Sequence, residues 1–164
     1  MILVTVGNHT QGFPRLIRKM DEFAEKMPEE VIMQIGATDY HPQNARHFRS
    51  TSQEEMDRLN REARLVVTHA GAGSILTGLK WGKPMVIVPR LAKYGEHFDD
   101  HQLQLADVLS QAGKVITVYE VEELEEAINR ASQMMPSSTL KGSSLVSALR
   151  TLVEELDNSY TSIG

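Results

Sequence analysis

Two groups of small and polar residues have the types and spacing of anion-binding turns. The first group follows an apolar run at residues 2–6 and consists of Gly7, Asn8, His9 and Thr10. The second follows an apolar run at residues 65–67 and consists of His69, Gly71, Ala72, Gly73 and Ser74. Small residues permit a tight turn, and the free N–H groups and positive dipole end of a helix N-terminus favour a phosphate. These residues therefore predict the binding of a phosphorylated ligand.

The second group has a functional and a structural interpretation. A histidine at the end of a buried strand is often a satisfied core residue, but the glycine turn beside His69 favours contact with a phosphoryl oxygen, provided that a neighbour holds its other ring nitrogen. Gly71 and Gly73 also permit close packing of a helix on a strand. We expect Ser74 to cap a helix that runs to about residue 81 and Gly82 to end it.

Strand and helix patterns alternate along the chain, which predicts an α/β fold. We expect a Rossmann-like open parallel sheet with helices on both faces. The predicted strands are residues 2–6, 31–35, 46–49, 65–67, 85–88 and 115–118. The predicted helices are residues 13–27, 52–63, 74–81, 98–111 and 121–131, with a capping box formed by Ser52 and Glu55. Ligands bind at the carboxyl ends of the strands in such sheets, where both glycine turns fall.

Length and composition limit the alternatives. The 164 residues, 41% of them hydrophobic, predict one domain at residues 1–132, a linker at 133–143 and an amphipathic helix and tail at 144–164. The helix either folds back on the domain or docks on another protein. A net charge of −5 argues against non-specific binding to nucleic acid. No cysteine is present, which fits a reducing cytoplasm, and no apolar run is long enough to cross a bilayer.

A metal site is not expected. His97 and His101 have the i, i+4 spacing of a zinc pair, with acidic residues between them. No glutamate base follows the first histidine, and charged residues at a helix start usually act as caps and dipole partners. We therefore favour the interpretation without a metal.

The stretch HAGAGSILTGLKWGKPMVIVPR, followed by GEHFDDHQLQLADVL, resembles the C-terminal, donor-binding domain of glycosyltransferase family 28. That domain is the half of a two-domain GT-B enzyme that holds a UDP-sugar, and the start, MILVTVGNHTQGFPRLI, is similar to it too. Members of this size pair with a membrane-anchored subunit, as in the dolichol-linked N-acetylglucosaminyltransferase and in bacterial capsule and exopolysaccharide transferases. The segment VPRLAKYGEHFDDHQ resembles the bacterial exopolysaccharide kind most.

The resemblance implies a donor-binding subunit that works with a membrane-anchored, acceptor-binding partner. The subunit would be recruited from the cytoplasm to the inner face of the membrane. It would help to transfer glucuronate, galactose or N-acetylglucosamine from a UDP-sugar to a lipid-linked sugar, without a metal or other cofactor. We expect little activity without the partner. The alternative is a regulatory module that binds a nucleotide without catalysis, whereas a non-hydrolysing epimerase would need its other half in the same chain.

The resemblance also implies roles for particular residues. Backbone groups of residues 49–53, including Ser52 and Gln53, would bind uracil, and the sugar hydroxyls would be read by Asp100, His101 and Gln102. The diphosphate would lie against the two glycine turns. His9 is the local candidate for the catalytic base, because its loop would face the cleft, but its position fits donor binding equally well, and the partner is the other possible source of the base.

One position departs from the family pattern. Thr77 stands where many members have a glutamate that holds the ribose hydroxyls, and a hydroxyl cannot make the paired contact of a carboxylate. Ribose recognition is therefore expected to have moved, with Glu96 as the candidate, or the isolated subunit binds its donor weakly.

Overall fold

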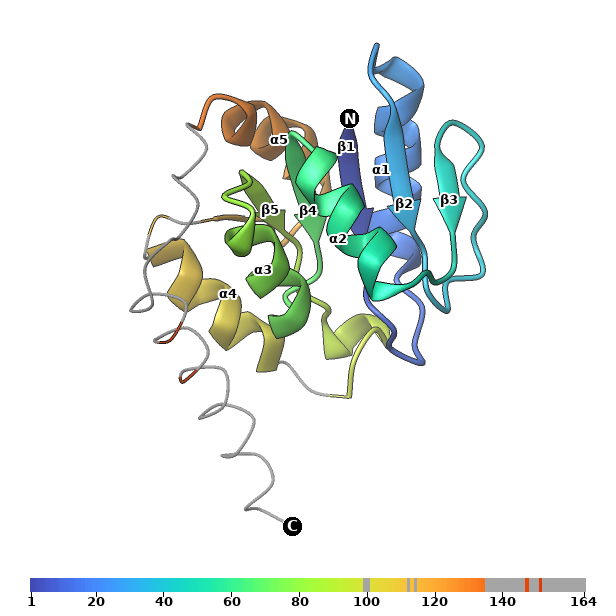
Figure 1. The fold of residues 1–164 in the computed structure, drawn as a ribbon. Coiled ribbons are helices and arrows are strands. Elements are labelled where there is room, and N and C mark those ends of the chain that lie inside the picture. Colours follow the sequence, from blue (N-terminus) through green and yellow to red (C-terminus); the bar gives the residue numbers. More distant parts are fainter. Residues whose placement is uncertain (99–100, 112, 114, 135–146, 148–150, 152–164) are drawn as a thin grey trace.

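A parallel β-sheet forms the centre of the protein (Figure 1). The computed structural model describes residues 1–98, 101–111, 113, 115–134, 147 and 151. The described residues form a six-stranded sheet in the order β3-β2-β1-β4-β5-β6, with every pair parallel. The strands are β1 Ile2–Thr5, β2 Val31–Gln34, β3 Arg46–Phe48, β4 Leu65–Thr68, β5 Met85–Ile87 and β6 Ile116–Thr117. The strand order reverses between β1 and β4, which creates a crevice at their carboxyl ends.

Helices cover both faces of the sheet, as predicted (Figure 1). The α-helices are α1 Pro14–Lys26, α2 Gln53–Glu62, α3 Ala72–Lys80, α4 His101–Gln111 and α5 Leu124–Ser132. Helices α1 and α5 share one apolar core with Ile2 and Val4, while α2, α3 and α4 share the other with Leu3. Successive residues of β1 thus point to opposite layers, and burial on both faces explains why its sequence is apolar throughout. The predicted fold class is confirmed.

Most predicted elements match the observed ones to within a few residues. Ser52 caps α2 by accepting a hydrogen bond of 3.2 Å from the Glu55 N–H. The prediction that Ser74 caps the next helix is wrong, because α3 begins at Ala72 with Gly71 at the N-cap, in extended conformation. The segment predicted as one acidic helix opens with a 3-10 turn at Val121–Glu123. The predicted linker and C-terminal helix lie almost wholly outside the described residues.

A buried carboxylate on α1 holds the loop that leads to β3. Asp21 is only 2% exposed and accepts hydrogen bonds from the Tyr40 hydroxyl at 2.7 Å, the Gln43 N–H at 2.9 Å and the Asn44 N–H at 2.8 Å. We expect Asp21→Ala to lower the free energy of unfolding by about 3 kcal/mol, because buried donors would lose their acceptor. Urea denaturation measures this value. The neighbouring Glu22→Ala, at an exposed position, should change it by no more than about 0.5 kcal/mol.

Candidate nucleotide-diphosphate site

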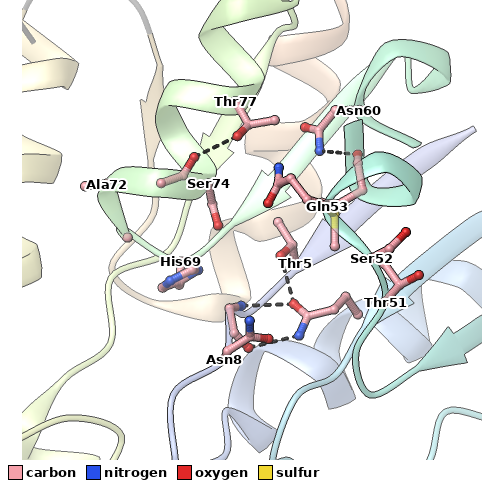
Figure 2. A pocket seen from close by; sticks show the side chains of 15 residues that line it. Thr5, Asn8, Thr51, Ser52, Gln53, Asn60, His69, Ala72, Ser74 and Thr77 are labelled. Carbon is pink, nitrogen blue, oxygen red and sulfur yellow. Dashed lines mark hydrogen bonds between the residues drawn. The ribbon is translucent and has the colours of Figure 1, made fainter. Parts of the chain in front are cut away.

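A polar cavity of about 400 Å³ opens at the carboxyl ends of β1, β2 and β4 (Figure 2). We call it the switch-point pocket. Its predicted lining residues are Gly7, Asn8, Ser52, Gln53, His69, Gly71, Ala72, Gly73 and Ser74. Its other lining residues are Thr5, Gln34, Thr51, Met56, Asn60 and Thr77. The two glycine turns, which are more than sixty residues apart in the sequence, therefore meet in one pocket because β1 and β4 are neighbours.

The N-terminus of α3 supplies the pocket with hydrogen-bond donors. The first helical hydrogen bond runs from the Ile75 N–H to the Gly71 carbonyl at 3.1 Å, so the amides of Ala72, Gly73 and Ser74 precede it and lack acceptors within the helix. Gly71 provides no side-chain cap, and the first turn holds no acidic residue. Neither a side-chain cap nor an acidic residue of the first turn therefore neutralises the positive end of the α3 dipole. This end of the helix favours the binding of an anion.

His69 lies between the two glycine turns. The imidazole is so close to both backbones that a Cβ atom built on Gly71 would be 2.1 Å from its Nε2 atom, and one built on Gly7 would be 2.7 Å from its Cε1 atom. Gly7 also has a φ of 72°, in the left-handed region that favours glycine. The side chain of His69 is only 8% exposed. Glycine at these two positions therefore makes room for the ring.

The His69 imidazole is neutral at physiological pH. Burial, and secondly the nearby Arg90 guanidinium, lower its pKa from 6.5 to about 4. Among the described lining residues His69 is the only titratable side chain, so the pocket walls carry no formal charge at pH 7. Attraction for an anion comes from N–H dipoles and from the field of Arg90, which does not line the pocket.

The His69 pKa predicts how stability depends on pH. The unfolded chain binds a proton at His69 near pH 6.5, whereas the folded chain resists it down to about pH 4. Between these values the unfolded state binds more protons, so the stability contributed by His69 is complete above pH 6.5 and is lost as the pH falls towards 4. The expected loss is about 3 kcal/mol. Urea denaturation at pH 7 and pH 4.5 should show a steeper decrease for the wild type than for His69→Gln; equal decreases would contradict the prediction.

Gln34 joins the ends of three strands beneath the pocket. Its Oε1 atom accepts hydrogen bonds from the Thr5 hydroxyl at 2.9 Å and from the N–H groups of Val6 and Gly7 at 3.0 Å each. Its Nε2 atom donates to the carbonyls of Gly7 at 2.9 Å and Arg49 at 3.0 Å. The side chain of Gln34 is 2% exposed, and both polar atoms of its amide are hydrogen-bonded. Gln34 therefore sets the position of the first glycine turn relative to residues 49–53.

The side chain of Arg90 also holds the loop 6–12, which contains the first glycine turn. Its side chain is 1% exposed and donates to the carbonyls of Val6 at 2.9 Å and of Gln11 and Gly12 at 3.0 Å each. A fourth hydrogen bond of 3.0 Å reaches the Glu96 carbonyl. Burial lowers the pKa of Arg90 to about 10, which leaves the guanidinium charged at pH 7. Both ends of the loop 6–12 are thus attached to one cation.

Several predicted site residues lie outside the described lining of the switch-point pocket: His9, Thr10, Glu96 and Gln102. The Glu96 carboxylate, 3% exposed, accepts two hydrogen bonds of 2.9 Å from Arg15 and one of 3.0 Å from the Leu91 N–H. Gln102 accepts from the Arg90 N–H at 3.1 Å. Through these contacts Glu96, and Gln102 from the first turn of α4, hold the loop that follows β5. Asp100 and the side chain of His101 lie outside the described residues.

His9 stacks beside the pocket rather than in it. Its ring centroid is 4.8 Å from that of His97, and its Nδ1 atom accepts a hydrogen bond of 3.1 Å from the Gln11 N–H. Burial, then Arg90 and His97, lower its pKa, so the ring is neutral at pH 7 with its proton on Nε2. This arrangement suits a hydrogen-bond donor better than a general base.

Helix α2 contributes Gln53, which was predicted, and two residues that the sequence interpretation missed, Met56 and Asn60. Gln53, Met56 and Asn60 follow the i, i+3, i+7 spacing of one helical face, and Figure 2 shows Gln53 and Asn60 lying opposite Thr77 of α3. The polar ends of the apolar strands, Thr5 and Gln34, were also missed. A polar residue that closes an otherwise apolar strand, as in ILVT and VIMQ, is the signal that could have identified them.

Within the described residues, no group of three or more histidine, cysteine or acidic side chains is arranged to hold a metal. The helices of this part of the chain are also too short or too polar to cross a membrane.

The fold and the pocket define a class: a doubly wound α/β domain with an uncapped helix N-terminus at its topological switch point. The model of the glycosyltransferase family 28 C-terminal domain matches residues 1–162, and the chain belongs to this family. The fold is that of the C-terminal, Rossmann-like half of GT-B glycosyltransferases.

Individual relatives agree with this assignment. The UDP-N-acetylglucosamine transferase subunit ALG13 of Cryptococcus neoformans is 42% identical over 74 residues, which are 44% of this chain and 34% of that protein. The chain thus matches about a third of that relative. The solution structure of ALG13 has a TM-score of 0.61 at 24% identity and covers 94% of this chain and 96% of its own. The calicheamicin glycosyltransferase CalG4 has a TM-score of 0.63 at 20% identity, with 96% and 38% covered. These two structures are evidence for the fold.

Proposed function

We propose that this chain is the donor-binding subunit of a two-component glycosyltransferase. It would bind a UDP-sugar in the switch-point pocket, and a membrane-anchored partner subunit would bind the lipid-linked acceptor. The principal support is the uncapped N-terminus of α3, which lines the pocket together with His69. Family membership and the similarity to a transferase subunit point in the same direction.

The pocket chemistry fits the departure of a nucleoside diphosphate. Cleavage of the bond between sugar and diphosphate places developing negative charge on the leaving phosphate, and preoriented donors stabilise that charge. The amides of Ala72, Gly73 and Ser74 provide such donors without reorganisation. We propose that no metal is required, so that EDTA leaves the rate unchanged while magnesium fails to raise it.

The transferred sugar is a hexosyl residue in this proposal. The names of the ALG13 relatives favour N-acetylglucosamine, whereas the resemblance of the loop after β5 to bacterial exopolysaccharide subunits favours glucuronate or galactose. A panel of the three UDP-sugars with the reconstituted complex distinguishes them. The highest kcat/KM identifies the donor.

Reconstitution tests the proposal as a whole. The purified chain should show little transfer alone and should gain activity when a co-expressed membrane partner is added with a lipid-linked acceptor. In the cell, we expect the chain to be cytoplasmic and to reach the membrane through that partner. Nucleotide binding without transfer in the reconstituted complex would favour the regulatory module instead. Full activity of the chain alone would contradict the need for a partner.

A further inference from the structure

Asn60 lines the switch-point pocket, and within the described residues one of its side-chain atoms is a buried hydrogen-bond acceptor without a partner. Its side chain is 2% exposed, and its Nδ2 atom donates to the Met56 carbonyl at 2.9 Å. Its Oδ1 atom is buried and has no hydrogen-bond partner in the part of the chain that the structure describes. The opposite amide orientation would set Oδ1 against the Met56 carbonyl oxygen, so the hydrogen bond fixes which atom is free.

A buried acceptor without a donor is unusual in a folded protein. Such groups are nearly always paired, because desolvation without a hydrogen bond is unfavourable. Gln34, which also lines this pocket, has every side-chain polar atom paired. The free Oδ1 atom of Asn60 therefore indicates a ligand that brings an O–H or N–H group to this wall.

Thr77 provides a second acceptor on the facing helix. Its hydroxyl donates to the Gly73 carbonyl at 2.9 Å, so its proton is used and its lone pairs are available (Figure 2). Asn60 and Thr77 lie opposite each other, on α2 and α3 (Figure 2). Two acceptors on facing walls match a ligand with two adjacent donors, as in a vicinal diol.

We propose that Asn60 binds a ribose hydroxyl of the nucleotide, opposite Thr77, whose position on α3 the family resemblance already assigns to the ribose. This inference rests on the proposed function, in which the diphosphate lies at the α3 N-terminus and the base near Ser52 and Gln53. The ribose joins these two groups, and Thr77 follows Ser74 by three residues on α3, so one turn of helix separates the phosphate donors from the diol acceptors. Asn60 thus takes the role that the sequence interpretation gave to Glu96, whose carboxylate is bound to Arg15.

Binding of nucleotide analogues to the full chain tests the inference. UDP, 2′,3′-dideoxy-UDP and CDP are titrated by NMR up to millimolar concentration. The wild type should bind UDP about tenfold or more tightly than the dideoxy analogue, because each neutral hydrogen bond contributes up to about tenfold. Asn60→Leu should reduce this ratio to about threefold, and the double variant with Thr77→Val should bring it close to one, while affinity for the dideoxy analogue changes by less than about twofold.

Controls separate recognition from folding. Asn60→Leu removes an unpaired polar atom, so its Tm should equal or exceed that of the wild type; Asn60→Ala is the second variant if leucine does not fit. Glu62→Gln, on the same helix but outside the pocket lining, should keep the wild-type ratio.

Each contrary result has its own meaning. An unchanged ratio of UDP to dideoxy-UDP in the Asn60 variants would overturn the role of Asn60 while the proposed function stands. The role of Asn60 would also be overturned if its variants lost the preference for UDP over CDP but kept the wild-type ratio of UDP to dideoxy-UDP affinity. Asn60 would then accept a hydrogen bond from the uracil N3–H instead of from the ribose. If the wild type bound none of the nucleotides, the proposed function itself would fail.

Discussion

Gly71→Ala is expected to abolish nucleotide binding, with a decrease in UDP affinity of about a hundredfold or more. The new methyl group would be 2.1 Å from the Nε2 atom of His69. The imidazole cannot move away freely, since the backbone of Gly7 lies close on its other side and the ring is buried. The ring would therefore enter the pocket or displace the turn. Overpacking and the loss of glycine at the N-cap should together lower the free energy of unfolding by about 2 kcal/mol.

Gly73→Ala is the matched comparison. Apart from its chain neighbours and the adjacent backbone of α3, a Cβ atom at Gly73 would meet no described atom within 4 Å, because this face of α3 opens into the pocket. Because alanine is the better helix former, the free energy of unfolding of this variant should rise by about 0.5 kcal/mol. Its affinity for UDP should fall about tenfold, because the methyl group would occupy space that the ligand needs. Calorimetry and urea denaturation of both variants measure these opposite effects on stability. Wild-type UDP affinity in Gly73→Ala would show that the diphosphate does not approach this turn.

Arg90→Met is expected to cause the largest loss of stability, about 4 kcal/mol in the free energy of unfolding. The buried guanidinium donates to four carbonyls, those of Val6, Gln11, Gly12 and Glu96. Methionine fills a similar volume but leaves these acceptors without a donor in a site that water does not reach. The amide resonances of the loop 6–12 should broaden or shift, because both ends of that loop lose their attachment.

Lys93→Met serves as the control for Arg90→Met. Lys93 lies close to Arg90 in the sequence, but its side chain is 59% exposed and its ion pair with Glu120 is 3.8 Å long. An exposed pair of this kind contributes little, so the change should be no more than about 0.5 kcal/mol. If urea denaturation gave less than about 1 kcal/mol for Arg90→Met, the carbonyl cluster would not depend on the guanidinium as described.

The fold class and the meeting of the two glycine turns in one pocket could be predicted from the sequence alone. Short apolar runs followed by turn residues, such as 2–6 and 65–67, indicate strands buried on both faces, and the periodic helices between them favour a parallel sheet. The carboxyl ends of such strands lie at one edge of the sheet, which is why the two glycine turns were expected in one crevice. These properties follow from local patterns, and local patterns are visible in a sequence.

Which polar side chains face the pocket depends on tertiary packing and could not be predicted from the sequence. Glu96 and Gln102 carry suitable groups, but packing of the loop after β5 commits them to Arg15, Leu91 and the Arg90 backbone. Gln34 and Asn60 looked like ordinary residues of a strand and a helix, yet the strand order and the facing of α2 and α3 bring them to the pocket walls. The direction and pairing of a side chain depend on neighbours that are distant in sequence, and a single sequence does not encode those neighbours in any local pattern.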